Sequence, residues 1–135
     1  MTERPMTERP MAERLGILLI SGTHERAHYA FVLATGAAAI GRAVTLFATN
    51  DGCRALLRDW SGLEDAARDE AVQARGVAGL DELREAAVEL GVRLLACDAG
   101  LAMAGIDAAG LMTGAEVSGV SAFLAQVGGG AVVSL

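Results

Sequence analysis

Residues 80–97 read Leu-Asp-Glu-Leu-Arg-Glu-Ala-Ala-Val-Glu-Leu-Gly-Val-Arg-Leu-Leu-Ala-Cys, and they contain the clearest helix-to-strand transition of the chain. Its first part has apolar residues at 80, 83, 87 and 90, a helical spacing that predicts an amphipathic helix ended by Gly91. The apolar run 92–96 that follows is typical of a strand buried on both faces. A helix that leads directly into a buried strand is half of a βαβ unit, which favours a parallel sheet.

The same alternation extends along the rest of the chain. Further helices are expected at 24–40, 98–104 and 120–127, and further strands at 15–21, 43–49, 116–118 and 131–134. Parallel strands joined by helices require right-handed crossovers, which place helices on both faces of the sheet. We therefore expect an α/β fold with three α/β/α layers and a mainly parallel sheet of about five strands.

The length and composition indicate one folded domain. The chain has 135 residues, of which 53% are hydrophobic and 21% charged, which is not the composition of a disordered protein. Its start reads MTERP, MTERP, MAER, a tandem repeat with two prolines and little that could be buried. We expect a disordered tail over 1–14 and a single domain over 15–135.

The charge distribution excludes some partners. The net charge is −6, and the segment 59–89, with nine acidic residues and three arginines, carries all of it. Nucleic-acid binding is not expected, because no basic stripe faces a phosphate backbone. The apolar stretches are shorter than the roughly 20 residues of a membrane-spanning helix, and the start lacks an apolar signal region. These features predict a cytoplasmic protein with no membrane span.

Two cysteines, Cys53 and Cys97, are the candidate reactive groups, and no CxxC pair or zinc-binding set is present. The loops 21–24, 50–53 and 97–100 each follow a predicted strand, so they are expected at one carboxyl edge of the sheet. Cys97 is the better nucleophile candidate, because backbone N–H groups at the start of the next helix favour a thiolate. The carboxylate of Asp98 opposes this. Alternatively, each cysteine is a small buried hydrophobic residue.

Residues 24–28 read His-Glu-Arg-Ala-His, which matches the HExxH pattern of zinc proteases. A metalloprotease is not expected, because His24 and His28 are the only histidines in the chain. A metal site of His24, His28 and Cys97 is a weaker alternative to two polar residues in an exposed first helical turn. Without GxGxxG or GxxxxGK[ST], no phosphate cradle is indicated, and we expect no cofactor.

Three stretches carry a family resemblance: residues 80–97 with 103–106, the opening strand with Ser21-Gly22 and its Ala-rich helix, and residues 114–123. In this order they resemble the DsrE/DsrF-like family, and within it the branch labelled peroxiredoxin-like. The resemblance implies a homo-oligomer, a trimer or hexamer, that takes part in sulfur relay. In that family a cysteine after the third strand carries sulfane sulfur as a persulfide between donor and acceptor proteins. Cys97 matches this position, whereas no family role attaches to Cys53.

The leading hypothesis is a sulfurtransferase-like carrier that holds a persulfide on Cys97, with N–H groups from the two preceding loops directed at the sulfur. The residues expected to line this site are Ser21, Gly22, Thr23, Asn50, Gly52, Cys53 and Asp98. The alternative is a non-enzymatic oligomeric module that binds a small ligand or a metal at the same edge, with His24 and His28 as ligands. A third hypothesis is a redox switch in which the cysteines form a disulfide, for which their Cα atoms must lie within about 7 Å.

Overall fold

The computed structural model describes residues 13–135, and within them five strands form one all-parallel sheet. The strand order is β4-β3-β2-β1-β5. The strands are β1 (Arg14–Leu19), β2 (Ala43–Ala48), β3 (Arg93–Cys97), β4 (Ala115–Ser118) and β5 (Ala131–Ser134). This confirms the predicted α/β class. Strand β1 begins one residue earlier than expected. Residues 1–12 of the predicted tail lie outside the residues that the structure describes.

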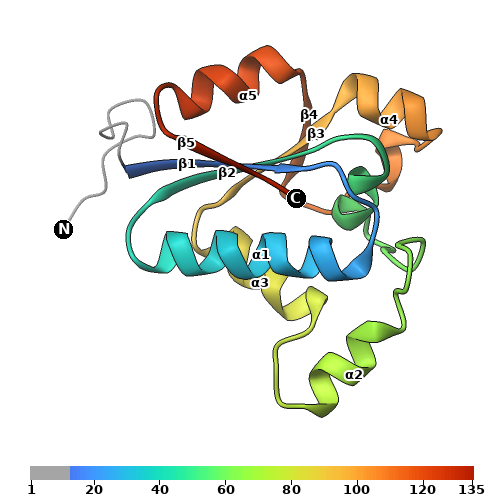
Figure 1. Ribbon diagram of the computed structural model, residues 1–135. Coiled ribbons are helices and arrows are strands. Elements are labelled where there is room, and N and C mark those ends of the chain that lie inside the picture. Colours follow the sequence, from blue (N-terminus) through green and yellow to red (C-terminus); the bar gives the residue numbers. More distant parts are fainter. Residues whose placement is uncertain (1–12) are drawn as a thin grey trace.

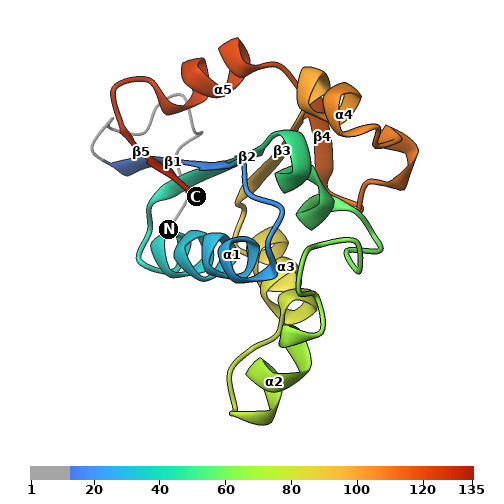
Figure 2. The same cartoon turned by 45° about the vertical axis from the view of Figure 1, so that its right-hand side comes forward.

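Helices cover both faces of the sheet (Figure 1). Helices α1 (His24–Ala39) and α3 (Leu80–Glu89) pack on one face, and α5 (Val120–Val127) and the short α4 (Asp98–Ala104) lie on the other. Two 3₁₀ helices, η3 (Asn50–Leu56) and η4 (Ala108–Gly110), follow β2 and α4. Helix α2 (Arg68–Ala74) projects away from the sheet, as Figure 2 also shows.

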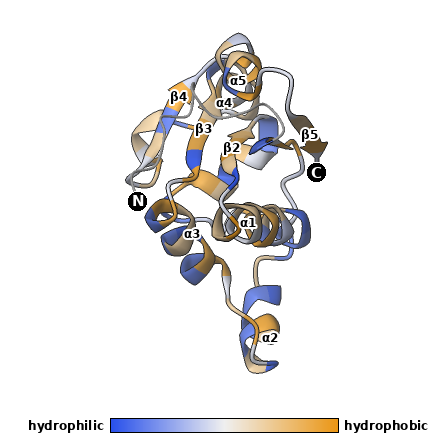
Figure 3. Cartoon of the chain, turned by 90° about the vertical axis from the view of Figure 1, so that its left-hand side faces the viewer, coloured by the Kyte–Doolittle hydropathy of each residue, from blue (hydrophilic) through white to orange (hydrophobic). Residues whose placement is uncertain are grey.

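Local sequence explains where the long helices begin and end. The Thr23 hydroxyl accepts a hydrogen bond from the Arg26 N–H at 3.3 Å and so caps the start of α1. Gly91 follows α3 in a left-handed conformation, with φ of +81°, which an L-residue with a side chain rarely adopts. In Figure 3 the strands are mostly coloured as hydrophobic, whereas the outward side of α3 is hydrophilic. Along α3, Leu80 and Ala87 are buried as the apolar spacing predicts, whereas Leu90 is 45% exposed and Arg84 is buried.

The core has two parts, one on each face of the sheet. The larger part, under α1 and α3, contains Ile17, Leu19, Phe31, Leu46 and Leu94. The smaller part, under α5, contains Phe47, Leu95, Cys97, Phe123 and Val127. The rings of Phe47 and Phe123 stack with centroids 4.9 Å apart. Cys97 thus belongs to the α5 side of the sheet.

Over residues 13–135, no helix has the length and apolar character needed to cross a membrane.

Candidate functional site

The segments that follow β1 and β2 meet at the carboxyl edge of the sheet. The Gly52 N–H donates to the carbonyls of Ile20 and Thr49, both at 3.0 Å. A Cβ atom on Gly52 would collide with the Leu19 carbonyl, and one on Gly22 would lie 2.6 Å from the Asp51 Cβ. The two loops therefore touch through backbone, which only glycine permits at these positions.

Cys97 occupies the junction between the last residue of β3 and the first turn of α4. It is the N-cap of α4, and its sulfur accepts a hydrogen bond from the Gly100 N–H at 3.4 Å. The residue is 7% exposed. A Cβ atom on Gly100 would collide with the Thr49 hydroxyl and the Asn50 backbone nitrogen, so this turn packs directly against the end of β2. Close packing here holds the Cys97 sulfur at the sheet edge beside the loop that contains Cys53.

Cys53 is buried at the same edge, and its thiol is a donor. It is 0% exposed, and its Sγ donates to the Ala48 carbonyl at 3.4 Å. Burial raises the pKa of Cys53 from 9.0 to about 11, and the negative charges of Cys97 and Asp51 add to the increase, although the Cys97 backbone N–H partly opposes it. At neutral pH, Cys53 therefore keeps its proton, and Cys97, which is 7% exposed, is left as the nucleophile candidate of the pair.

The predicted lining residues divide into two groups. Cys53 and Asp98 are neighbours of Cys97, and Asn50 packs against Gly100 of the same turn. The exposed Asp98 carboxylate accepts the Ala99 N–H at 2.7 Å. Ser21 and Thr23 turn instead toward α1, where their hydroxyls lie 3.0 Å apart.

The expected N–H donors from the first two loops have other acceptors. The Thr23 N–H donates to the Ser21 hydroxyl, and the Gly52 N–H to the carbonyls named above. The donor to the Cys97 sulfur is the Gly100 N–H. The sequence analysis did not predict this donor, although Gly100 stands three residues after Cys97, where an N-cap side chain usually finds its N–H partner. Phe123, which covers the Cys97 side of the sheet, carries no local sign in the sequence, because it reaches the site only through packing.

The HExxH histidines are not in an exposed first turn, so that expectation is wrong. His24 is 0% exposed and His28 is 6% exposed, because the segment from 57 to 79 folds over them. The His24 Nε2–H donates to Asp69 Oδ1 at 2.7 Å, and its Nδ1 accepts from Arg68 at 3.2 Å. The His28 Nε2–H donates to the Ala78 carbonyl at 2.8 Å. Both side chains thus tether the α2 segment to α1.

The histidines also do not form the metal site considered from the sequence. In residues 13–135, no group of three or more His, Cys, Asp or Glu side chains is placed to hold a metal ion. Asp69, the acidic partner of His24, is already engaged by the Leu80 N–H at 2.9 Å and by the Gln73 amide at 2.9 Å. The HExxH pattern therefore has a structural role here.

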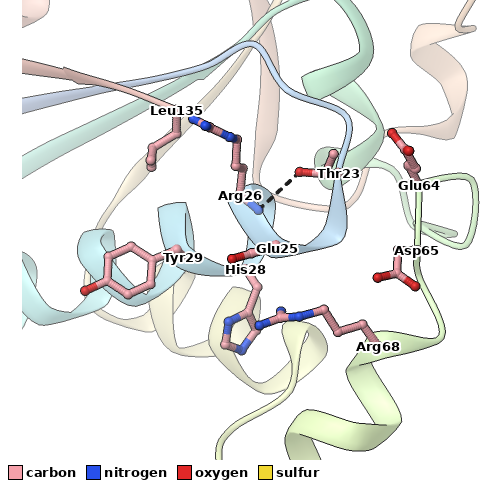
Figure 4. Close-up of a pocket in the computed structure, with 9 residues that line it drawn as sticks. All are labelled: Thr23, Glu25, Arg26, His28, Tyr29, Glu64, Asp65, Arg68 and Leu135. Atoms are coloured by element: carbon pink, nitrogen blue, oxygen red, sulfur yellow. Dashed lines mark hydrogen bonds between the residues drawn. The ribbon is translucent and has the colours of Figure 1, made fainter.

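A cavity of about 610 Å³ lies between α1 and the 64–68 segment (Figure 4). Its lining contains two arginines, Arg26 and Arg68, and three carboxylates, those of Glu25, Glu64 and Asp65. The remaining lining residues are Thr23, His28, Tyr29 and Leu135. The mixture of opposite charges suits a small polar molecule that carries both signs.

The comparisons with known proteins agree with this architecture. The chain is 27% identical to the uncharacterized protein YrkE of Bacillus subtilis (strain 168), over 88% of this chain and 94% of that protein. The fold is similar to the crystal structure of the ychN protein from E. coli, with a TM-score of 0.68 at 16% identity, over 90% of this chain and 98% of the other. It is also similar to MTH1491 from Methanobacterium thermoautotrophicum, a protein of unknown function, with a TM-score of 0.56 at 20% identity and the same coverage. The model of the DsrE/DsrF-like family matches residues 13–133, and the chain belongs to this family.

Proposed function

We propose that this protein is a sulfurtransferase-like carrier of the sulfur-relay type, which holds sulfane sulfur as a persulfide on Cys97. The observation that carries the proposal is the placement of the Cys97 sulfur. It stands at the carboxyl edge of a parallel sheet, where ligands of such folds gather, and it accepts the Gly100 N–H. The Gly100 N–H holds the sulfur at this edge, where a donor's sulfane sulfur could reach it. Membership of a family often linked to sulfur relay supports the same conclusion.

The chemistry is two successive exchange reactions at sulfur. In the first, the Cys97 thiolate attacks the sulfane sulfur of a donor protein or small donor, and the donor's remaining group leaves with the electron pair. In the second, an acceptor thiolate attacks the outer sulfur, and Cys97 leaves as a thiolate. The neighbouring apolar side chains of Phe47, Leu95 and Phe123 limit the access of water to the inner sulfur. We expect this exchange in a reducing compartment such as the cytoplasm, where Cys97 stays free.

Intact-protein mass spectrometry tests the proposal. The protein is incubated with inorganic polysulfide, freed of excess donor, and weighed before and after reduction. We expect a reducible gain of one sulfur atom on wild type and on Cys53→Ser, and no gain on Cys97→Ser. If Cys97→Ser, shown to be folded by circular dichroism, still takes up reducible sulfur, the assignment of Cys97 is wrong.

We further propose that the protein works as a homo-oligomer, a trimer or hexamer. Helix α5 supports this, because Val120 and Leu124, one turn apart, are 55% and 56% exposed on a helix without charged residues. Light scattering after size-exclusion chromatography measures the mass directly. A monomer at micromolar concentration would contradict this part of the proposal.

The cavity between α1 and the 64–68 segment favours a second candidate function, a non-enzymatic module that binds a small ligand. Its arginines and carboxylates would hold the two charges of a zwitterion. Calorimetric titration with free amino acids, on wild type and Arg68→Gln, tests this reading. Saturable heat in wild type that is lost in the variant would support it, and no heat in either protein would count against it for this ligand class.

A further inference from the structure

We propose that Cys53 is the resolving thiol of the Cys97 site: it discharges the Cys97 persulfide as hydrosulfide and closes a Cys53–Cys97 disulfide. This inference rests on the proposed function, since it concerns the fate of the loaded sulfur. It assigns a role to the cysteine for which the family resemblance offers none.

The geometry places both cysteines near one rung of the sheet, Cys53 in the core part under α1 and α3 and Cys97 in the part under α5. Ala48 and Ala96 are register partners in β2 and β3, and neighbouring parallel strands lie about 4.8 Å apart. The Cys53 sulfur is bonded to the Ala48 carbonyl of this rung, and Cys97 is the residue directly after Ala96. The Cys97 backbone N–H and the Cys97 charge both act on the Cys53 thiol, which requires the two residues to be close neighbours.

The packing of α4 keeps the two cysteines together. Figures 1 and 2 both show η3, which contains Cys53, beside the start of α4. At this contact the Gly100 Cα lies so near Thr49 and Asn50 that no side chain fits. Separation of the two thiols would require α4 to move away from the end of β2.

The discharge step balances without an external oxidant. The Cys53 thiol loses its proton to solvent, and its sulfur attacks the Cys97 Sγ, the inner sulfur of the persulfide. The bond between Cys97 Sγ and the outer sulfur breaks, and the outer sulfur leaves with the electron pair as hydrosulfide. The sulfane sulfur is thereby reduced to sulfide, and the two cysteines are oxidised to the disulfide.

Burial makes this discharge slower than transfer to an acceptor. Cys53 must give up its hydrogen bond to the Ala48 carbonyl and lose its proton inside the core before it can attack. An acceptor thiolate from solvent is already ionised and has no buried hydrogen bond to break, so neither barrier applies to it. The persulfide therefore lasts long enough to be transferred when an acceptor is present. When none arrives, it is cleared as hydrosulfide.

The test follows the loaded protein over time. Wild type, Cys53→Ser and Cys53→Ala are loaded with inorganic polysulfide and freed of donor, and released sulfide and intact mass are then measured without an acceptor. We expect wild type to release one sulfide per persulfide and to end two hydrogens lighter than the reduced protein. Both variants should release sulfide at least about tenfold more slowly, because no second thiol of the same molecule remains to attack the inner sulfur. The alanine variant adds no buried hydroxyl, so it guards against a folding defect specific to serine.

The outcomes separate the two proposals. Equal sulfide release from wild type and from both folded variants, after equal loading, overturns the role of Cys53 and leaves the carrier function intact. If wild type takes up no sulfur, the carrier function and the discharge both fail. Treatment of unloaded protein with the thiol oxidant diamide then tests separately whether the two cysteines can form a disulfide. A loss of two hydrogens that requires both cysteines shows that they can, and no loss shows that their sulfurs do not meet.

Discussion

The buried Cys53 thiol should make the protein less stable in alkaline solution. Its pKa is about 11 in the folded protein against the usual 9.0, so below pH 9 both the folded and the unfolded chain keep the proton. As the pH rises from 9 to 11, the unfolded chain ionises at Cys53 while the folded chain does not, and the free energy of unfolding falls. The raised pKa thus costs stability only above pH 9, and the loss is complete above about pH 11.

The size of the effect follows from the shift. A difference of two pKa units corresponds to about 3 kcal/mol at full ionisation, and to about 1.4 kcal/mol at pH 10. Since a domain is stable by only about 5–15 kcal/mol, the loss at pH 10 is measurable.

Urea unfolding under reducing conditions, at pH 7 and pH 10, measures the effect on wild type and Cys53→Ala. The loss of the buried sulfur lowers the stability of the variant equally at both pH values. The variant has no thiol at position 53 to ionise, and all its other titrating groups are those of wild type. We expect wild type to lose about 1.4 kcal/mol more than the variant between the two pH values. Cys97→Ser should keep most of this slope, because burial is the larger cause of the shift. Parallel pH profiles for wild type and Cys53→Ala would show that the pKa of Cys53 is not raised in the folded protein.

Three further predictions concern packing and hydrogen bonding. Gly100→Ala should destabilise the protein by more than about 1 kcal/mol in urea unfolding, because the new methyl group collides with Thr49. Gly52→Ala should be at least as harmful, as its Cβ meets a β1 carbonyl that cannot move without breaking the sheet; a stability equal to wild type would contradict both clashes. Asp69→Asn should cost roughly 1–3 kcal/mol at neutral pH through weaker bonding to His24. Burial raises the pKa of Asp69, but the hydrogen bonds it accepts outweigh this and leave it below 3.8, so its stabilisation is present above that pH and lost below it. The Asn variant should lack this loss in acid unfolding curves.

The order and type of the main elements could be predicted from the sequence. Apolar runs such as 92–96 predict strands, and an apolar spacing such as that of 80, 83, 87 and 90 predicts a helix, because both patterns depend on neighbours along the chain. From the alternation of the two follows a parallel sheet, and from the parallel sheet follows the common edge that holds Cys97.

The histidines show where this reasoning stops. The HExxH spacing correctly places His24 and His28 on one helical face, but it says nothing about what covers that face. The answer comes from Asp69 and Ala78, which are 45 and 50 positions away from their histidine partners. A local pattern cannot report a contact whose partner is distant in sequence.

The helices, the strands and the position of Cys97 at the carboxyl end of a buried strand thus follow from the sequence by itself. The folded structure adds that Cys53 is a buried, protonated thiol beside Cys97, and that the Gly100 N–H donates to the Cys97 sulfur. The physical reason is that secondary structure follows from the period of apolar residues, whereas burial and proton affinity depend on which surfaces the folded chain brings into contact.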